Sequence, residues 1–160
     1  MDVNVATKRA SKNSTVARGS AFEDMVFSYL SDELREGRLG FHDANSRIRG
    51  SPKYYSADRG SDISFDLSIE VSMSGSESVS YLVLVECKDY SGSVPVDDLE
   101  EFNSKVVQVS GLNVKAIFIS TAPLQAGALN YARSRKIAVA RYFHGEGCKW
   151  ELRRRVSSSV

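Results

Sequence analysis

The most hydrophobic stretch of the chain runs from Tyr81 to Val85 and ends in Glu86-Cys87-Lys88. Apolar residues at every position predict a short strand that is buried on both faces, in the middle of a sheet. Glu86 and Lys88 are one residue apart, so on a strand both side chains leave the same face. Two interpretations stand beside each other. The pair is an ordinary ion pair at a strand end, or Glu86 binds a divalent cation while Lys88 positions or activates water.

The preceding stretch, Ser61 to Ser72, alternates between apolar and polar residues. This pattern predicts one half-buried strand with its acidic residues on the face opposite to its apolar residues. A Ser- and Gly-rich turn follows, so the two strands are expected to form an antiparallel hairpin. If the turn is symmetric about Ser76, Asp66 lies directly opposite Glu86, at about 5 Å. The same register places Asp62 opposite Tyr90, and a slip of two residues makes Asp62 the second choice.

A helical pattern of apolar residues predicts a first helix from Ser20 to about Glu36, which ends at Gly37. Ser20 and Glu23 have the spacing of a capping box, in which Glu23 bonds the first turn of the helix. Glu23 also lies at the edge of the buried stripe, from which it can reach toward the sheet. Both interpretations of Glu23 stay open.

The remaining pattern predicts a helix, a strand, a helix and one or two strands. The helix follows Val94-Pro95 and carries Lys105 and Gln108 beside its buried stripe, facing either the site or the solvent. Strands are expected at Val114–Thr121 and Lys136–Ala140, with a helix at Leu124–Arg135 between them and an edge strand at Lys149–Val156. Strands that alternate with helices imply a partly parallel sheet, and the early hairpin makes it mixed. The predicted fold is α/β, a mixed sheet with helices on both faces.

The length of 160 residues suits one domain with a single core. Residues 1–17 are expected to be a flexible basic tail, residues 18–156 the domain, and residues 157–160 a Ser-rich tail. Two cysteines make no disulfide framework. Because no apolar run approaches the length of a membrane span or resembles a secretory signal, we expect a cytoplasmic protein that does not bind membranes.

The net charge is only +1, but the charges are segregated along the chain. Acids outnumber bases ten to one from Gly60 to Glu101, whereas bases predominate on both sides of that segment. This distribution fits a cation-binding segment between segments that contact a polyanion, or solvated faces that merely cluster. The candidate DNA-contacting residues are Arg47, Arg49, Lys53 and Arg59, which lie near Tyr54 and Tyr55.

Asp66 on one strand, Glu86-Cys87-Lys88 on the next, and the helices and strands that follow resemble the PD-(D/E)XK nuclease superfamily. Within it, the chain resembles the Mrr-like restriction endonucleases over about Ser20 to Arg141. The resemblance implies a restriction-endonuclease-like core and a metal-dependent endonuclease that hydrolyses DNA. Asp66, Glu86 and the Cys87 carbonyl would be the ligands of Mg²⁺ or Mn²⁺, and Lys88 would orient water or offset charge on the phosphate.

The resemblance also assigns supporting roles in catalysis to Glu23 in the first helix and to Gln108 in the helix after the Glu-x-Lys strand. Phe65 stands where the superfamily has proline before the aspartate. The choice between Asp66 and Asp62 therefore stays open, and Asp58 is third. The alternatives are a nuclease-fold module that binds DNA or a partner without cleaving, and a Holliday-junction resolvase. A chain of 160 residues has little room for a separate target-recognition domain, so we expect partners or a homodimer to contribute if cleavage is sequence-specific. A resolvase would be an obligate dimer.

Overall fold

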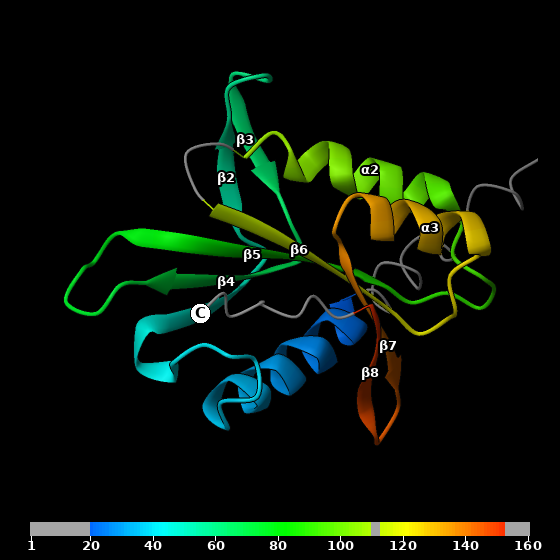
Figure 1. Ribbon diagram of the computed structural model, residues 1–160, viewed down its shortest axis with the longest axis horizontal. Coiled ribbons are helices and arrows are strands. Elements are labelled where there is room, and N and C mark those ends of the chain that lie inside the picture. The colour runs from blue at the N-terminus through cyan, green and yellow to red at the C-terminus, as the bar shows by residue number, and fades with distance from the viewer. Residues whose placement is uncertain (1–19, 110–112, 153–160) are drawn as a thin grey trace, which may run out of the picture.

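The computed structural model describes residues 20–109 and 113–152, which form an α/β structure around a six-stranded mixed sheet (Figure 1). The sheet order is β1-β4-β5-β6-β7-β8, and β5, β6 and β7 are parallel neighbours while the other pairs are antiparallel. The strands of this sheet are β1 (Ser46–Gly50), β4 (Leu67–Ser72), β5 (Val79–Lys88), β6 (Asn113–Ser120), β7 (Ala138–Phe143) and β8 (Gly147–Leu152). The predicted fold class is confirmed.

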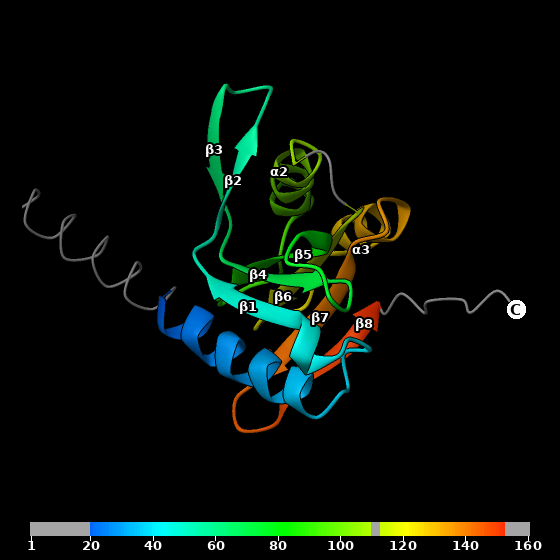
Figure 2. The ribbon, with the colours of Figure 1, turned by 90° about the vertical axis from the view of Figure 1, so that its left-hand side faces the viewer.

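Helices cover both faces of this sheet, and each face has its own hydrophobic cluster. Helices α2 (Val96–Val106) and α3 (Ala126–Ser134) lie on one face, and the N-terminal helix, described over residues 20–35, lies on the other (Figures 1 and 2). The cluster under α2 and α3 contains Leu82 and Leu84, whereas the cluster under the N-terminal helix contains Val83 and Val85. Strand β5 is therefore buried on both faces, as its sequence predicts.

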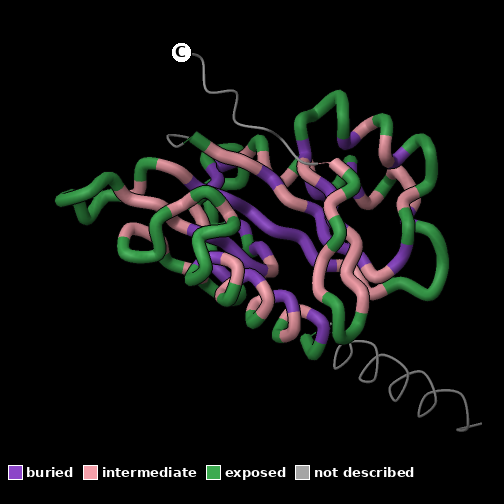
Figure 3. The backbone as a smooth tube through the Cα atoms, turned by 60° about the horizontal axis from the view of Figure 1, so that its bottom comes forward, coloured by how far each residue is buried: buried purple, intermediate pink, exposed green. Residues whose placement is uncertain are grey.

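Figure 3 shows the buried residues concentrated along the centre of the sheet and on one side of the N-terminal helix. The buried side chains of that helix are Phe22, Val26, Leu30 and Leu34, spaced four residues apart along one face. Gly37, at φ +71°, follows its last turn, as expected of a glycine at a helix end. The predicted cap is wrong, because Ser20 is itself helical and the Ser20–Glu23 pair is not a capping box.

The predicted register of the β4–β5 hairpin is confirmed. Leu67 pairs with Val85 and Val71 with Tyr81, which is the pairing expected for a turn centred on Ser76. A bulge shifts the register only at the turn end, between Val71 and Ser72. Asp66 therefore precedes the first paired residue of β4 at the end of the sheet where β5 delivers Glu86.

The prediction of one strand from Ser61 to Ser72 is wrong. The chain leaves β3 (Ser61–Ser64), passes through Phe65 and Asp66, and only then enters β4. Ile63 and Phe65 consequently pack in the cluster under α2, whereas Leu67 and Ile69 pack under the N-terminal helix. The alternation of apolar residues continues through a bend, so the residues of one stripe end on opposite faces of the sheet.

Strand β3 pairs with β2 (Lys53–Ser56) to form a separate two-stranded sheet, the β2–β3 hairpin, which projects beyond the main sheet (Figure 2). Its base is fastened to the main sheet by the Tyr54 hydroxyl, which lies 2.7 Å from Ser68 Oγ and donates to Glu70 Oε1 at 2.8 Å. Burial and the neighbouring Glu70 carboxylate raise the pKa of Tyr54 to about 12. The hydroxyl therefore stays protonated and remains a donor to Glu70.

The later elements follow their predictions closely. The expected strand at Lys136–Ala140 is β7, displaced toward the C-terminus because Lys136 adopts φ +59° in the turn after α3. The expected edge strand at Lys149–Val156 is β8, which begins at Gly147 and, among the residues that the structure describes, pairs only with β7; residues 153–156 lie outside them. The predicted tails, residues 1–17 and 157–160, lie outside the described residues, as does the end of the predicted domain.

Candidate active site

The side chains of Glu86 and Lys88 project from the C-terminal end of β5 toward the face of the sheet that α2 covers. The Lys88 ammonium lies 3.5 Å from Glu86 Oε1, and the Glu86 side chain is only 11% exposed. The buried neighbours Leu82 and Leu84, on the same face of the strand, pack against α2. The sequence therefore places a carboxylate and an ammonium at the point where a hydrophobic strand reaches the edge of its helix layer.

Asp66 is brought to the same place by the bend before β4. Its Oδ2 accepts a hydrogen bond of 2.7 Å from the backbone N–H of Cys87, between Glu86 and Lys88. The Cys87 thiol packs instead with the cluster under the N-terminal helix, and burial raises its pKa well above the ordinary value. The backbone N–H of Cys87 is thus the group that contacts Asp66, and the role of the Cys87 carbonyl as a metal ligand stays a prediction.

The two carboxylates disfavour each other's charge. Burial raises the pKa of Glu86 to about 6, and the charge of Asp66 adds to the effect, although Lys105 and Lys88 oppose it. Burial also raises the pKa of Asp66, against the lowering influence of the Cys87 N–H and the two lysines. Two buried carboxylates held together at a free-energy cost are typical of a site that uses their charge.

Lys88 remains a cation in this environment. Burial tends to lower its pKa, but the charges of Glu86 and Asp98 outweigh burial, so the pKa of Lys88 is raised. In the protein without a metal ion, Lys88 therefore acts as a positive charge and a donor rather than as a neutral base.

A second lysine, Lys105 in the last turn of α2, completes the group. Its Nζ lies 3.7 Å from Glu86 Oε2 and 4.9 Å from the centre of the Phe65 ring. The sequence pattern left this residue facing either the site or the solvent. Phe102 lies three residues earlier on the buried stripe, and residues three apart share one face of a helix. This spacing is the sequence signal that favours the orientation of Lys105 toward the site.

Glu23 approaches the site from the N-terminal helix. Burial raises the pKa of Glu23, and the charges of Asp66 and Asp24 raise it further. The electrostatic interaction with Asp66 places Glu23 in the neighbourhood of the acidic pair, in line with the interpretation that it reaches toward the sheet. The residues that the structure gathers are thus Asp66, Glu86, Lys88, Lys105 and, at the margin, Glu23.

Gln108 is engaged elsewhere. Its side-chain oxygen accepts hydrogen bonds from Ser56 Oγ and Arg59 Nε, both at 3.0 Å, and its side-chain nitrogen donates to the Ser104 carbonyl at 2.9 Å. These contacts fasten the β2–β3 hairpin to the end of α2. The structure therefore gives Gln108 a role in holding the hairpin, one turn away from the contact that Lys105 makes with Glu86.

The alternatives to Asp66 lie in the β2–β3 hairpin. Asp62 is exposed in β3 and pairs with Tyr55, so the predicted position opposite Tyr90 is wrong. Asp58 is exposed in the turn between β2 and β3. Since the bend at Phe65 and Asp66 separates the hairpin from β4, the hydrogen bond with the Cys87 N–H belongs to Asp66 and to neither alternative.

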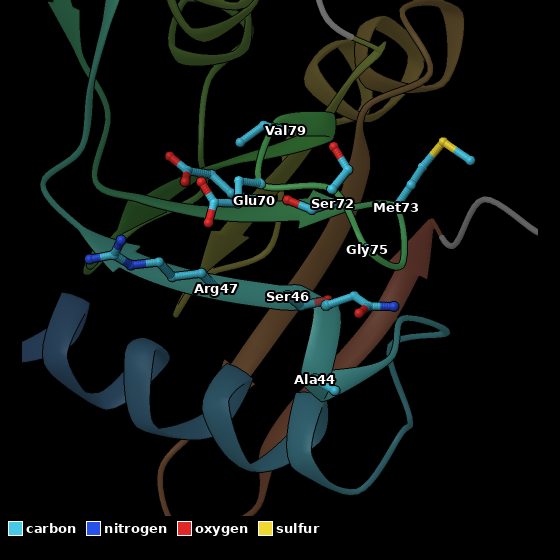
Figure 4. A pocket seen from close by; sticks show the side chains of 11 residues that line it. Ala44, Ser46, Arg47, Glu70, Ser72, Met73, Gly75 and Val79 are labelled. Atoms are coloured by element: carbon cyan, nitrogen blue, oxygen red, sulfur yellow. The ribbon is translucent and has the colours of Figure 1, made fainter.

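The four basic residues predicted to contact DNA fall into two kinds. Arg49 is bound to Glu70, with 3.0 Å between Nη1 and Oε1, and Arg59 is bound to Gln108. Arg47 and Lys53 are exposed on β1 and β2. Arg47 also lines a polar hollow of about 580 Å³ between β1 and the β4–β5 turn, together with Ser46, Glu70 and Met73 (Figure 4). That hollow lies at the opposite end of β4 and β5 from Asp66 and Glu86.

Hard divalent cations prefer carboxylate oxygens, and two features of the site fit such an ion. Glu86 Oε2 is buried and accepts no hydrogen bond among the described residues, and the two carboxylates disfavour each other's charge. Within residues 20–109 and 113–152, no three His, Cys, Asp or Glu side chains gather as a metal cluster. The side chains that could bind a metal ion at this site are therefore those of Asp66 and Glu86, with the Cys87 carbonyl as the predicted backbone ligand.

An aspartate that precedes one strand, a Glu-x-Lys at the end of its antiparallel neighbour, and a mixed sheet covered on both faces define a nuclease fold of the PD-(D/E)XK type. A family model for the Mrr catalytic domain, described as restriction endonuclease, matches residues 18–142. The chain belongs to this restriction endonuclease family, and the resemblance to the Mrr-like nucleases is confirmed.

No curated protein matches the chain. A solved crystal structure, described as that of a protein of unknown function, AF1548, is similar with a TM-score of 0.49 and 11% sequence identity. The match covers 74% of this chain and 60% of that chain. In the part of the chain that the structure describes, no helix combines the length and apolar character needed to cross a bilayer.

Proposed function

We propose that the protein is a metal-dependent DNA endonuclease that hydrolyses phosphodiester bonds at the site formed by Asp66, Glu86 and Lys88. The observation that carries the proposal is the convergence of these three groups, where Asp66 bonds the N–H of Cys87 and Lys88 contacts Glu86. The family of the chain supports the same activity. DNA is the proposed substrate.

Asp66 and Glu86, with the Cys87 carbonyl, would hold Mg²⁺ or Mn²⁺. Such an ion supplies charge neutralisation for a phosphate oxygen and lowers the pKa of a bound water. The protein contributes a fixed geometry, because the hydrogen bond from Cys87 N–H to Asp66 ties the bend before β4 to the end of β5. The carboxylates consequently need little reorganisation before they act.

Lys88 supplies a fixed positive charge on the same side of the strand as Glu86. Because its pKa is raised, its ammonium donates hydrogen bonds to an attacking water or to a phosphate oxygen, and offsets the negative charge that develops there. Its side chain is 31% exposed, so a phosphate that approaches from solvent has access to it. Lys88 therefore orients the reactants and stabilises charge without serving as the base.

The test compares cleavage of supercoiled plasmid and linear duplex by wild type, Lys88→Ala and Glu86→Gln, with Mg²⁺, with Mn²⁺ and with a chelator. We expect metal-dependent cleavage by wild type and a loss of at least about 100-fold in each variant, with the circular dichroism spectrum unchanged. Glu100→Gln, on the exposed face of α2, is the matched control and should cleave normally.

Cleavage that persists in both Lys88→Ala and Glu86→Gln would contradict the proposal. Retardation of duplex DNA in a gel, without product under any metal condition, would instead identify a module of the nuclease fold that binds and does not cut.

A further inference from the structure

Lys105 is placed against the candidate active site although it comes from another layer of the fold. Its side chain is only 21% exposed, and its ammonium lies over the Phe65 ring, next to Asp66 in the chain. Lysine side chains on helix surfaces ordinarily keep their charge in water. A lysine that instead bends toward a buried carboxylate is held there by the charge of that carboxylate.

Glu86 is shared between two ammonium groups, one for each oxygen. Lys88 lies 3.5 Å from Oε1, and Lys105 lies 3.7 Å from Oε2. The second distance is too long for a hydrogen bond, and Oε2 is buried with no hydrogen-bond partner among the described residues. Lys105 therefore compensates the charge of Glu86 but leaves Oε2 free to accept a shorter ligand.

The backbone of Lys105 is fixed while its ammonium is not. The Lys105 carbonyl accepts a bond of 3.2 Å from the Gln108 N–H, and the Gln108 side chain fastens this end of α2 to Ser56 and Arg59 in the β2–β3 hairpin. Beyond that anchor, the side chain has four methylene groups and a compact charge that rotates freely. The ammonium can therefore change partners without any movement of the helix.

We propose that Lys105 is a second active-site lysine, which neutralises Glu86 Oε2 while no divalent cation is bound and pairs with a phosphate oxygen of DNA when a cation takes that oxygen. This inference rests on the proposed function, since it takes a divalent cation and DNA as the ligands. Lys88, on the strand itself, keeps its position at Oε1. The two lysines thus differ in role, because one is built into the strand and the other is exchanged between ligands.

The inference predicts effects of opposite sign from one substitution. Lys105→Met keeps the length of the side chain and removes its charge. Because an ammonium 3.7 Å from Oε2 repels a cation at that oxygen, its loss should tighten the binding of Mn²⁺ alone, by about 5-fold or more. The same loss should weaken the binding of duplex DNA and lower the slope of log affinity against log salt concentration by about 0.9, as for one phosphate contact.

The experiment titrates Mn²⁺ calorimetrically into wild type, Lys105→Met and Lys105→Arg without DNA at pH 8, where Glu86 is ionised. It then measures duplex binding by fluorescence anisotropy at several salt concentrations, with Ca²⁺ present. Lys105→Arg should keep the salt slope of wild type, because it keeps the charge. Lys149→Met, which alters an exposed lysine of β8 that pairs with Glu146 in the preceding turn, should match wild type in both measurements.

Weaker or unchanged Mn²⁺ binding by Lys105→Met would overturn the inference, because it would mean that the lysine only holds Glu86 in place. An unchanged salt slope would overturn it as well, since the ammonium would then have no phosphate partner. If wild type cleaves no DNA but Lys105→Met shows both predicted changes, the endonuclease proposal fails while the exchange of Lys105 between the two ligands stands.

Discussion

Replacing the central carboxylate of the site should make the metal-free protein more stable. The pKa of Glu86 is raised from 4.5 to about 6, chiefly by burial and then by the charge of Asp66. Since one pKa unit corresponds to about 1.4 kcal/mol, the charged form of Glu86 costs the folded state about 2 kcal/mol. Glu86→Gln keeps the shape of the side chain and removes that cost.

The pH dependence follows from the sign of this change. The folded protein holds the Glu86 proton more tightly than the unfolded chain does, so this group favours folding most below pH 4.5. Its contribution is lost as the pH rises through about 6. Glu86→Gln should therefore exceed wild type by about 2 kcal/mol in free energy of unfolding at pH 7.5, and the difference should disappear toward pH 4.5.

The assay is urea unfolding of both proteins in a chelating buffer at several pH values, followed by circular dichroism. Glu100→Gln, on the exposed face of α2, serves as the control for removing one negative charge. Two results would contradict this prediction. Glu86→Gln would be less stable than wild type at pH 7.5, or the difference in stability between the two proteins would not change with pH. The first result would mean that the two lysines stabilise the Glu86 carboxylate by more than burial and Asp66 destabilise it.

Two further predictions concern the packing that positions the site. Tyr54→Phe should lower the free energy of unfolding by about 1–2 kcal/mol, because buried Ser68 and partly buried Glu70 each lose a hydrogen-bond partner. Urea unfolding measures this loss beside Tyr55→Phe, which alters an exposed tyrosine, and equal stability of the two variants would count against it. Gly147→Ala should cost more than Gly145→Ala in the same assay. Both glycines have φ near +80°, but a Cβ at Gly147 overlaps the Tyr29 ring whereas a Cβ at Gly145 meets open space. Similar losses in the two variants would show that Tyr29 moves aside freely.

The local pattern was sufficient for much of this fold. The unbroken apolar run of β5 predicted its burial, and the turn centred on Ser76 predicted the register that the β4–β5 hairpin adopts. Asp66 was correctly placed beside the Glu86–Lys88 end of β5 for the same reason, because the register of a hairpin decides which residues lie opposite each other. The N-terminal helix and α2 followed from the spacing of their apolar stripes.

The bend at Phe65 and Asp66 did not follow from the pattern, because apolar residues continue to alternate through it. Only the pairing of β3 with β2 shows that Asp62 belongs to a different sheet from Asp66. The pattern also did not show that Ser20 is itself helical and not a cap. The same residue types occur at helix caps and in first turns, so their spacing does not separate the two.

The sequence by itself thus determined that Glu86 and Lys88 share one end of β5 and that Asp66 is the first candidate to join them, because the register of the hairpin is a local property. The choice of Asp66 over Asp62 needed the pairing of β3 with β2. The tertiary structure decided which residues from other layers join that group. Lys105 turns inward and Gln108 turns to the β2–β3 hairpin, although both lie beside the buried stripe of α2 in the sequence. The physical reason is that a long polar side chain at the margin of a helix is oriented by the charges and hydrogen-bonding groups of the neighbouring layer. The periodicity of the sequence shows which face of the helix is buried, but it does not show which groups lie opposite that face.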